Sequence, residues 1–277
     1  MITFFTIPKP FEGQIGVIQR NAISSWTRTH PDARVLLFGD ETGTAEAAAA
    51  AGSEHMLEIE RSAWGTPLLS DAFAQAERHA RGELLCFVNA DILLLDDFAP
   101  AVARIAALGR PFLAVGESWD TELREPLAFD EGWQERLQAL PSRRRGADAI
   151  DYFVFRRGLY TGMPPFAIGR TAFDNWLIWH ARSRRALVVD ATPVVKTLHQ
   201  RHEYDHGGGL AAIRVSPEAQ RNRELAGGKE RLYSRFDATH RLTRSGLVRN
   251  LGAPLRWKER SRRAAYKLRH GLLRRPL

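Results

Sequence analysis

The sequence predicts an α/β protein built on a mostly parallel sheet with helices on both faces. Two observations lead to this prediction. Short apolar runs alternate with segments of helical periodicity through the first half of the chain, an order typical of parallel strands joined by helices. The apolar runs are also continuous rather than alternating, as expected of strands that are buried on both faces.

The first four elements follow from local signals. Ile2–Ile7 is a β-rich run that a proline ends, and Gly16–Thr29 carries apolar residues at helical spacing. Val35–Phe38 is a short apolar strand stopped by a glycine and an aspartate. Thr44–Ala51 is rich in alanine, and Gly52 suits the end of a helix there.

The next elements lead into the strongest strand signal of the chain, Leu84–Val88. Asp97 is suited to the N-cap of the helix that follows it. Besides Leu84–Val88, the elements expected in this part are a strand over Met56–Ile59, a helix over Leu68–Ala80, an apolar stretch over Ile92–Leu95, a helix over Ala101–Leu108 and a strand over Phe112–Val115.

The second half is less regular. Residues 119–149 contain two prolines and the basic run Arg143–Arg145, which indicates a surface segment or a lid. Thr171 is expected to cap a helix over Ala172–Ser183, and His199–Gly209 is expected to be a polar loop. Strands are expected over Ile150–Arg156, Leu187–Asp190 and Val194–Leu198.

Charge is concentrated in the tail. The net charge is +8, and residues 254–277 hold nine Lys/Arg and one Glu, so the remainder is balanced. This balance argues against nucleic acid as the main partner. Drawn as a helix, the tail is basic and amphipathic, which suits either an anionic membrane surface or packing on the domain. The start of the chain lacks the basic region of a signal peptide and Cys86 stands alone, so we expect a cytoplasmic protein, with peripheral attachment at the inner face of the membrane as a hypothesis.

Polar side chains follow several of the predicted strands. Pro8, Asp40 and the tripeptide Asn89-Ala90-Asp91 all stand at carboxyl ends of strands, where ligands bind in open parallel sheets. A carboxylate there can hold Mg²⁺ or Mn²⁺ against a diphosphate, although an Asp and an Asn capping a turn would give the same pattern.

The order of strand, Asn-Ala-Asp and apolar stretch resembles the DxD region of GT-A glycosyltransferases, with Asn89 in place of the first aspartate. The resemblance covers residues 1–206 and includes the segment around Phe173-Asp174-Asn175-Trp176. It implies that Asp91 holds the metal, that Asn89 contacts ribose or water, and that Asp174 is the general base of an inverting reaction. The alternative is that Asp174 is an ordinary residue of a first helical turn.

The same resemblance implies further donor contacts. His199 would be a metal or diphosphate contact, Thr6 and Pro8 would hold the base and ribose, and Asp40 could accept a hydrogen bond from the base. Arg201 could offset diphosphate charge. The spacing of His199, His202 and His206 could also indicate zinc, although histidine-rich loops are commonly just polar.

These observations together predict a glycosyltransferase that moves a sugar from a nucleotide-diphosphate donor to a glycan or lipid-linked acceptor, in surface glycan synthesis. We expect a transferase domain over 1–206, with a nucleotide-binding half over 1–115 and an acceptor half over 150–206, and an extension over 207–277. Two alternatives stay open: a non-catalytic nucleotide-sugar-binding protein and a sugar-1-phosphate nucleotidyltransferase. The latter is disfavoured because the segment Thr6–Gly13 lacks clustered glycines.

Overall fold

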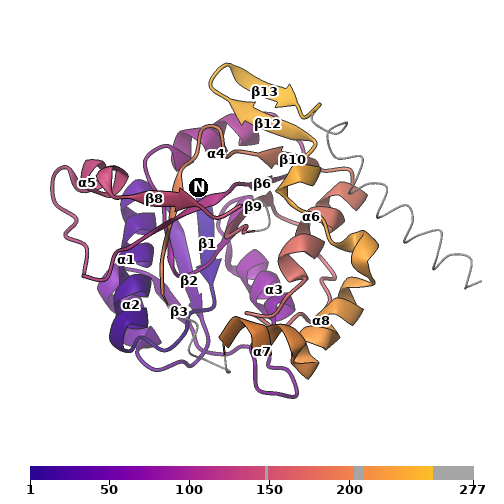
Figure 1. Ribbon diagram of the computed structural model, residues 1–277, viewed down its shortest axis with the longest axis horizontal. Helices are drawn as coiled ribbons and strands as arrows, with labels where there is room; N and C mark the ends of the chain where they lie inside the picture. Colours follow the sequence, from indigo (N-terminus) through magenta and orange to yellow (C-terminus); the bar gives the residue numbers. More distant parts are fainter. Residues whose placement is uncertain (147–148, 203–208, 252–277) are drawn as a thin grey trace, which may run out of the picture.

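The computed structural model describes residues 1–146, 149–202 and 209–251 (Figure 1). Its main sheet contains β1 Ile2–Thr6, β2 Arg34–Phe38, β3 Glu54–Met56, β4 Leu84–Val88, β6 Phe112–Val115, β9 Tyr152–Arg156, β10 Leu187–Asp190, β12 His240–Thr243 and β13 Gly246–Arg249. The spatial order is β13-β12-β10-β6-β9-β4-β1-β2-β3. Neighbours are parallel except at β9, which is antiparallel to both β4 and β6, and in the β12–β13 hairpin. The predicted mostly parallel sheet is confirmed.

Helices cover both faces of this sheet, and each face has its own core. The helices are α1 Gly13–Thr29, α2 Thr44–Ala51, α3 Leu69–His79, α4 Phe98–Ala106, α5 Trp133–Ala139, α6 Phe173–Ser183, α7 Gly209–Val215 and α8 Pro217–Ala226. Adjacent residues of β1 point to opposite faces. Phe5 meets Phe73 of α3 at 4.9 Å between ring centroids, and Phe4 meets Phe98 of α4 at 6.0 Å. Burial on both faces is the reason why the strands read as continuous apolar runs.

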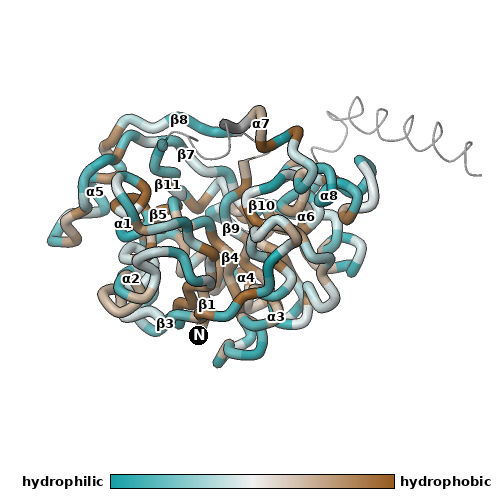
Figure 2. The backbone as a smooth tube through the Cα atoms, turned by 90° about the horizontal axis from the view of Figure 1, so that it is seen from below, coloured by the Kyte–Doolittle hydropathy of each residue, from teal (hydrophilic) through white to brown (hydrophobic). Residues whose placement is uncertain are grey.

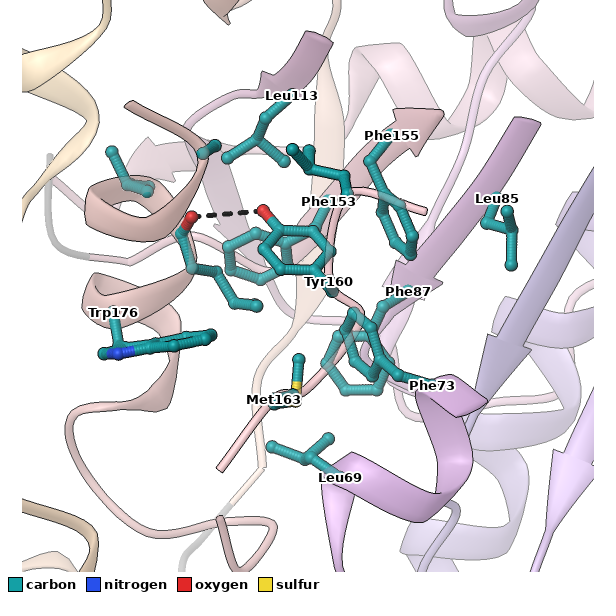
Figure 3. Close-up of a cluster of buried hydrophobic side chains, with 14 of the residues drawn as sticks. Leu69, Phe73, Leu85, Phe87, Leu113, Phe153, Phe155, Tyr160, Met163 and Trp176 are labelled. Atoms are coloured by element: carbon teal, nitrogen blue, oxygen red, sulfur yellow. Dashed lines mark hydrogen bonds between the residues drawn. The ribbon is translucent and has the colours of Figure 1, made fainter. Parts of the chain in front are cut away.

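The core beneath α6 is rich in aromatic rings (Figure 3). Phe73 stacks on Phe155 with centroids 5.4 Å apart, and Tyr160 meets Phe155 edge-on at 4.8 Å. The buried Tyr160 hydroxyl donates to the backbone oxygen of Leu177 at 3.1 Å, the bond drawn in Figure 3. This bond satisfies the hydroxyl and ties the loop after β9 to α6. Because aromatic packing resists deformation, α6 is held firmly against the sheet.

A smaller sheet lies beside the large one, in the order β5-β11-β7-β8. Its strands are β5 Ile92–Leu93, β11 Thr197–Gln200, β7 Ser118–Thr121 and β8 Ser142–Arg144. Figure 2 shows β8 in hydrophilic colours, whereas the central β1 and β4 are hydrophobic. The segment 119–149, expected to be less regular and at the surface, is largely exposed or half-buried, but β7, α5 and β8 within it were not predicted. Strands made of polar residues contain no apolar run, and an apolar run is the feature by which strands were predicted from the sequence.

Some boundaries also differ from the sequence predictions. The strand expected over Val194–Leu198 lies over Thr197–Gln200, so His199 is a strand residue and not the start of a loop. Ala172, not Thr171, is the N-cap of α6, with a left-handed φ of 88°. Asp97 does occupy the N-cap of α4, but its Oδ2 accepts the backbone N–H of Lys196 at 2.9 Å rather than one from its own helix.

The described residues beyond 206 pack closely on the rest of the chain. Beyond α7 and α8, the short 3-10 helices η2 Lys229–Arg231 and η3 Arg235–Asp237 lead to β12, which joins the large sheet beside β10. The predicted basic helix over 254–277 lies outside the described residues, as does His206, and the boundary at 206 stays a prediction. Among the helices that the structure describes, none has the length and apolar character that crossing a membrane requires.

Candidate functional site

A cavity of about 490 Å³ opens at the carboxyl ends of β1 and β4. Because these strands are parallel neighbours, the residues that follow them meet at one edge of the sheet. The start of α6 closes the other side. Of the predicted site residues, the structure brings five together in the lining of this cavity: Thr6, Pro8, Asn89, Asp91 and Asp174.

A carboxylate and two imidazoles form a cluster at the cavity wall. Asp91, His199 and His202 each offer a ligand atom, and these atoms lie within 4.8 Å of one another. The Oδ2 of Asp91 is 3.4 Å from Nε2 of His199 and 3.3 Å from Nε2 of His202. Nε2 of His199 and Oδ1 of Asp91 are buried and have no hydrogen-bond partner among the described residues. Two orphaned buried ligand atoms are what a bound cation would satisfy, so these residues fit a divalent metal.

The cluster is electrostatically coupled. Burial favours the neutral form of Asp91, but the neighbouring imidazoles of His199 and His202 outweigh it and hold the pKa of Asp91 well below its ordinary value. Burial alone would lower the pKa of His199, but the charge of Asp91 outweighs that effect and leaves the pKa raised. Asp91 is therefore ionised at neutral pH, which is the state a cation requires.

His199 owes its place to the small sheet. It is a partner of Ile92 in β5 and of Asp120 in β7, so the strand after Asp91 lies directly beside it. His202 follows the end of this strand and was considered in the sequence only for a zinc cluster. The sequence feature that could have identified His202 is the spacing His199-x-x-His202. This spacing indicates a cation site only once the structure places Asp91 close to both rings.

Asp174 stands in the first turn of α6 and lines the cavity. This is the position expected for a base facing an acceptor. Thr171, the residue expected to cap the helix, also lines the cavity, and its hydroxyl accepts a hydrogen bond from Arg223 at 3.2 Å.

Three predicted contacts do not line the cavity. One is His199, which adjoins the lining residue Asp91; the other two are Asp40 and Arg201. Asp40 forms an ion pair with Arg61, and its neighbour Glu41 lines the cavity instead. Arg201 pairs with Glu122 at 2.8 Å, and its side chain is 60% exposed. Both residues follow strands that reach this edge of the protein, but the side chains turn toward partners at the surface. Their roles as donor contacts stay predictions from the sequence.

Sequence reasoning missed several charged residues of the cavity. Lys9 is held by Gln19, which accepts the Lys9 backbone N–H at 2.7 Å and donates to its carbonyl at 2.8 Å. Arg145, from the run assigned to a surface segment, reaches Asp151 at 2.6 Å, and all three of Lys9, Arg145 and Asp151 line the cavity. The only sequence feature that pointed to these residues was a charged side chain near the end of a strand. Such residues are too common for this feature to identify a cavity residue.

The fold has clear relatives among solved structures, although no protein-family model and no curated protein matches the sequence. Glucosyl-3-phosphoglycerate synthase of M. tuberculosis matches with a TM-score of 0.51 at 17% identity, over 82% of this chain and 81% of that one. A structure of the same synthase with Mg²⁺ and uridine diphosphate gives 0.50 at 17% identity, over 82% and 80%. S. aureus TarS 1-349, in complex with UDP-GlcNAc, gives 0.51 at 12% identity, over 81% and 64%. At such identities the likeness establishes the fold, which is that of the GT-A glycosyltransferases.

Proposed function

We propose that this protein is a divalent-metal-dependent glycosyltransferase that uses a nucleotide-diphosphate sugar as donor. The observation on which the proposal depends is the cluster of Asp91, His199 and His202 at the wall of a cavity that also contains Asp174. Fold alone does not fix function, since one fold serves many activities. The similar synthase structure that holds Mg²⁺ and uridine diphosphate supports the proposal independently.

The residues present suit the chemistry of such a transfer. Asp91, His199 and His202 would hold Mg²⁺ or Mn²⁺, which neutralises charge on the departing nucleoside diphosphate when bound. Thr6 and Pro8 line the part of the cavity that follows β1, where the base and ribose would lie. Asn89 donates from its amide to Asp151 at 3.1 Å, which fixes its orientation toward the donor.

The acceptor would enter beside α6. Asp174 would take the proton from the acceptor hydroxyl as that oxygen attacks the anomeric carbon, so that the configuration inverts. A glycan or lipid-linked acceptor, and a place in surface glycan synthesis, belong to the proposal as predictions from the sequence. Attachment of residues 254–277 to an anionic membrane is likewise a prediction from the sequence.

The decisive experiment measures nucleoside-diphosphate release from a panel of UDP- and GDP-sugars with and without Mn²⁺. Asp91→Asn should reduce release at least about 100-fold, because a bound cation contributes several kcal/mol at roughly 1.4 kcal/mol per factor of ten. Asp96→Asn, an exposed aspartate in the same segment, is the matched control and should keep full activity.

Full activity of Asp91→Asn, or of the wild type in EDTA, would contradict the metal role. The binding-protein alternative predicts a different result: donor binding by calorimetry with no release under any condition.

A further inference from the structure

The imidazole of His199 lies between two carboxylates. Its Nδ1 is 2.8 Å from Oδ1 of Asp120, a hydrogen-bond distance, while its Nε2 is on the side of Asp91 at 3.4 Å. The side chains of His199 and Asp120 are 5% and 16% exposed. The two carboxylates therefore contact different nitrogens of one nearly buried ring.

This arrangement is fixed by the backbone. In the parallel pair β11–β7, His199 is the register partner of Asp120. Register partners on neighbouring strands place their side chains on the same face and close together. Because Asp91 precedes β5, the strand on the other side of β11, the small sheet sets Asp91, His199 and Asp120 in a row.

The Asp120 contact decides which nitrogen of the ring carries the hydrogen. An ionised carboxylate can only accept a hydrogen bond, so Nδ1 must be the donor. In the neutral imidazole the lone pair is then on Nε2, the atom that is buried without a partner among the described residues. A lone pair on Nε2 is what a cation held by Asp91 needs.

Asp120 is itself held in place by Arg145. The Nε of Arg145 is 3.2 Å from Oδ1 of Asp120, and its Nη1 is 2.6 Å from Oδ2 of Asp151. Asp151 in turn accepts the amide of Asn89 at 3.1 Å. Arg145 thus links Asp120, the hydrogen-bond partner of His199, to Asp151, the hydrogen-bond partner of Asn89.

We propose that Asp120 is a positioning residue for the cation site: it holds His199 in the Nδ1–H tautomer with Nε2 directed at the ion, and Arg145 fixes Asp120 for this task. The inference rests on the proposed function for the identity of the ligand. Carboxylates that orient metal-binding histidines in this way contribute about 10–100-fold to metal affinity in other proteins.

The test has two readouts that do not depend on turnover. Isothermal titration of the nucleotide-free protein with Mn²⁺ should give a dissociation constant about 10–100-fold higher for Asp120→Ala than for wild type. Glu122→Gln, two residues further along and paired with Arg201, is the control and should bind like wild type. Long-range ¹H–¹⁵N NMR of the metal-free protein, at an alkaline pH where the ring is neutral, should show His199 as the Nδ1–H tautomer, and this preference should be lost in Asp120→Ala.

Circular dichroism checks that the variant is folded. If Asp120→Ala does not fold, Asp120→Leu, which is similar in shape and has no hydrogen-bond acceptor, serves instead and should change both readouts in the same direction. Unchanged Mn²⁺ affinity together with an unchanged tautomer would overturn the role of Asp120. A wild type that binds no Mn²⁺ would contradict the metal part of the proposed function, and the tautomer of metal-free His199 would then decide the inference by itself.

Discussion

The two sheets of this molecule differ in the residues that they carry: the large sheet is mainly apolar, whereas the small sheet carries polar residues of the candidate site. The nine-stranded sheet is apolar on both faces, and its strands β1, β4 and β9 pack large aromatic rings. The four-stranded sheet carries Asp120 and His199 side by side and lies next to Asp91. Stability therefore comes mainly from the first sheet, and the proposed chemistry would take place at the edge between the two. If this division holds, substitutions in the site should lower activity without lowering stability. Substitutions of residues that join the sheets should lower stability.

The largest effect is expected at Asp174. Asp174→Asn removes the proposed base but keeps its volume and its place in the first turn of α6. Turnover should fall about 10²–10⁴-fold, because a positioned proton acceptor contributes that much. Donor affinity and melting temperature should stay near wild type, and the wild-type product should have the inverted anomeric configuration by NMR.

A retained configuration in the wild-type product would exclude Asp174 as the base of an inverting transfer, whatever the activity of the variant. A large fall in melting temperature would instead contradict the division between the sheets. Asp130→Asn, an exposed aspartate in the loop before α5, controls for the loss of one charge.

The difference between the sheets also explains how much of the fold the sequence predicts. Leu84–Val88, Phe112–Val115 and Leu187–Asp190 were predicted with the bounds that the structure gives. Each is apolar because helices cover both of its faces. The strands Ser118–Thr121 and Ser142–Arg144 were missed, since polar residues in short strands are held by pairings that no local pattern records.

The residues of the candidate site also differ in how far the sequence could predict them. Asp91 and Asn89 could be predicted to line the cavity because they follow the strongest strand, and Asp174 because the resemblance to GT-A glycosyltransferases pointed to the start of α6. Asp120 and Arg145 could not, because their roles depend on contacts between segments that are distant in sequence: Asp120 meets His199, and Arg145 meets Asp120. Asp40 and Arg201 show the converse: a charged residue after a strand also finds partners at the surface.

A smaller but still large effect is expected where the sheets are joined. Arg235 of η3 is buried and pairs with Asp190 of β10 at 2.7 Å and with Glu117, directly before β7, at 2.9 Å. Arg235→Ala leaves two carboxylates buried without their main counter-charge, which costs about 3–5 kcal/mol in comparable cases. Urea denaturation at neutral pH should show this loss in the free energy of unfolding.

Arg241 provides the control, since it approaches the same Asp190 oxygen at 3.7 Å but is 50% exposed. Arg241→Ala should cost less than about 1 kcal/mol. Equal losses of unfolding free energy in the two variants would show that the burial of Arg235 adds nothing to its ion pairs. Arg235 would then not be the residue that joins the two sheets.

The smallest effect concerns a contact between the N-cap of α4, a helix that packs on the large sheet, and the segment before β11 of the small sheet, at Asp97. Its Oδ2 accepts the backbone N–H of Lys196, just before β11, while its buried Oδ1 has no hydrogen-bond partner among the described residues. Burial raises the pKa of Asp97 to about 6, against the weaker effect of the Lys196 hydrogen bond. The folded state thus binds a proton that the unfolded state releases near pH 4, so this group favours folding at pH 5 and loses that contribution as the pH rises through 6.

Asp97→Asn imitates the protonated form at every pH and should remove this dependence. Relative to wild type, the variant should gain about 1 kcal/mol in unfolding free energy between pH 5 and pH 7.5, less than the full shift implies because the carboxyl is partly solvated. The difference between the two proteins must be used, because His30 titrates in the same range with the opposite sign. Burial lowers the pKa of His30 to about 4, so its contribution is present above pH 6.5 and is lost as the pH falls toward 4. His30 is common to both proteins and cancels in the difference. A difference that does not change with pH would mean that Asp97 is ionised in the folded protein throughout this range, and that its contact with Lys196 ties α4 to the segment before β11 as a charge-assisted hydrogen bond.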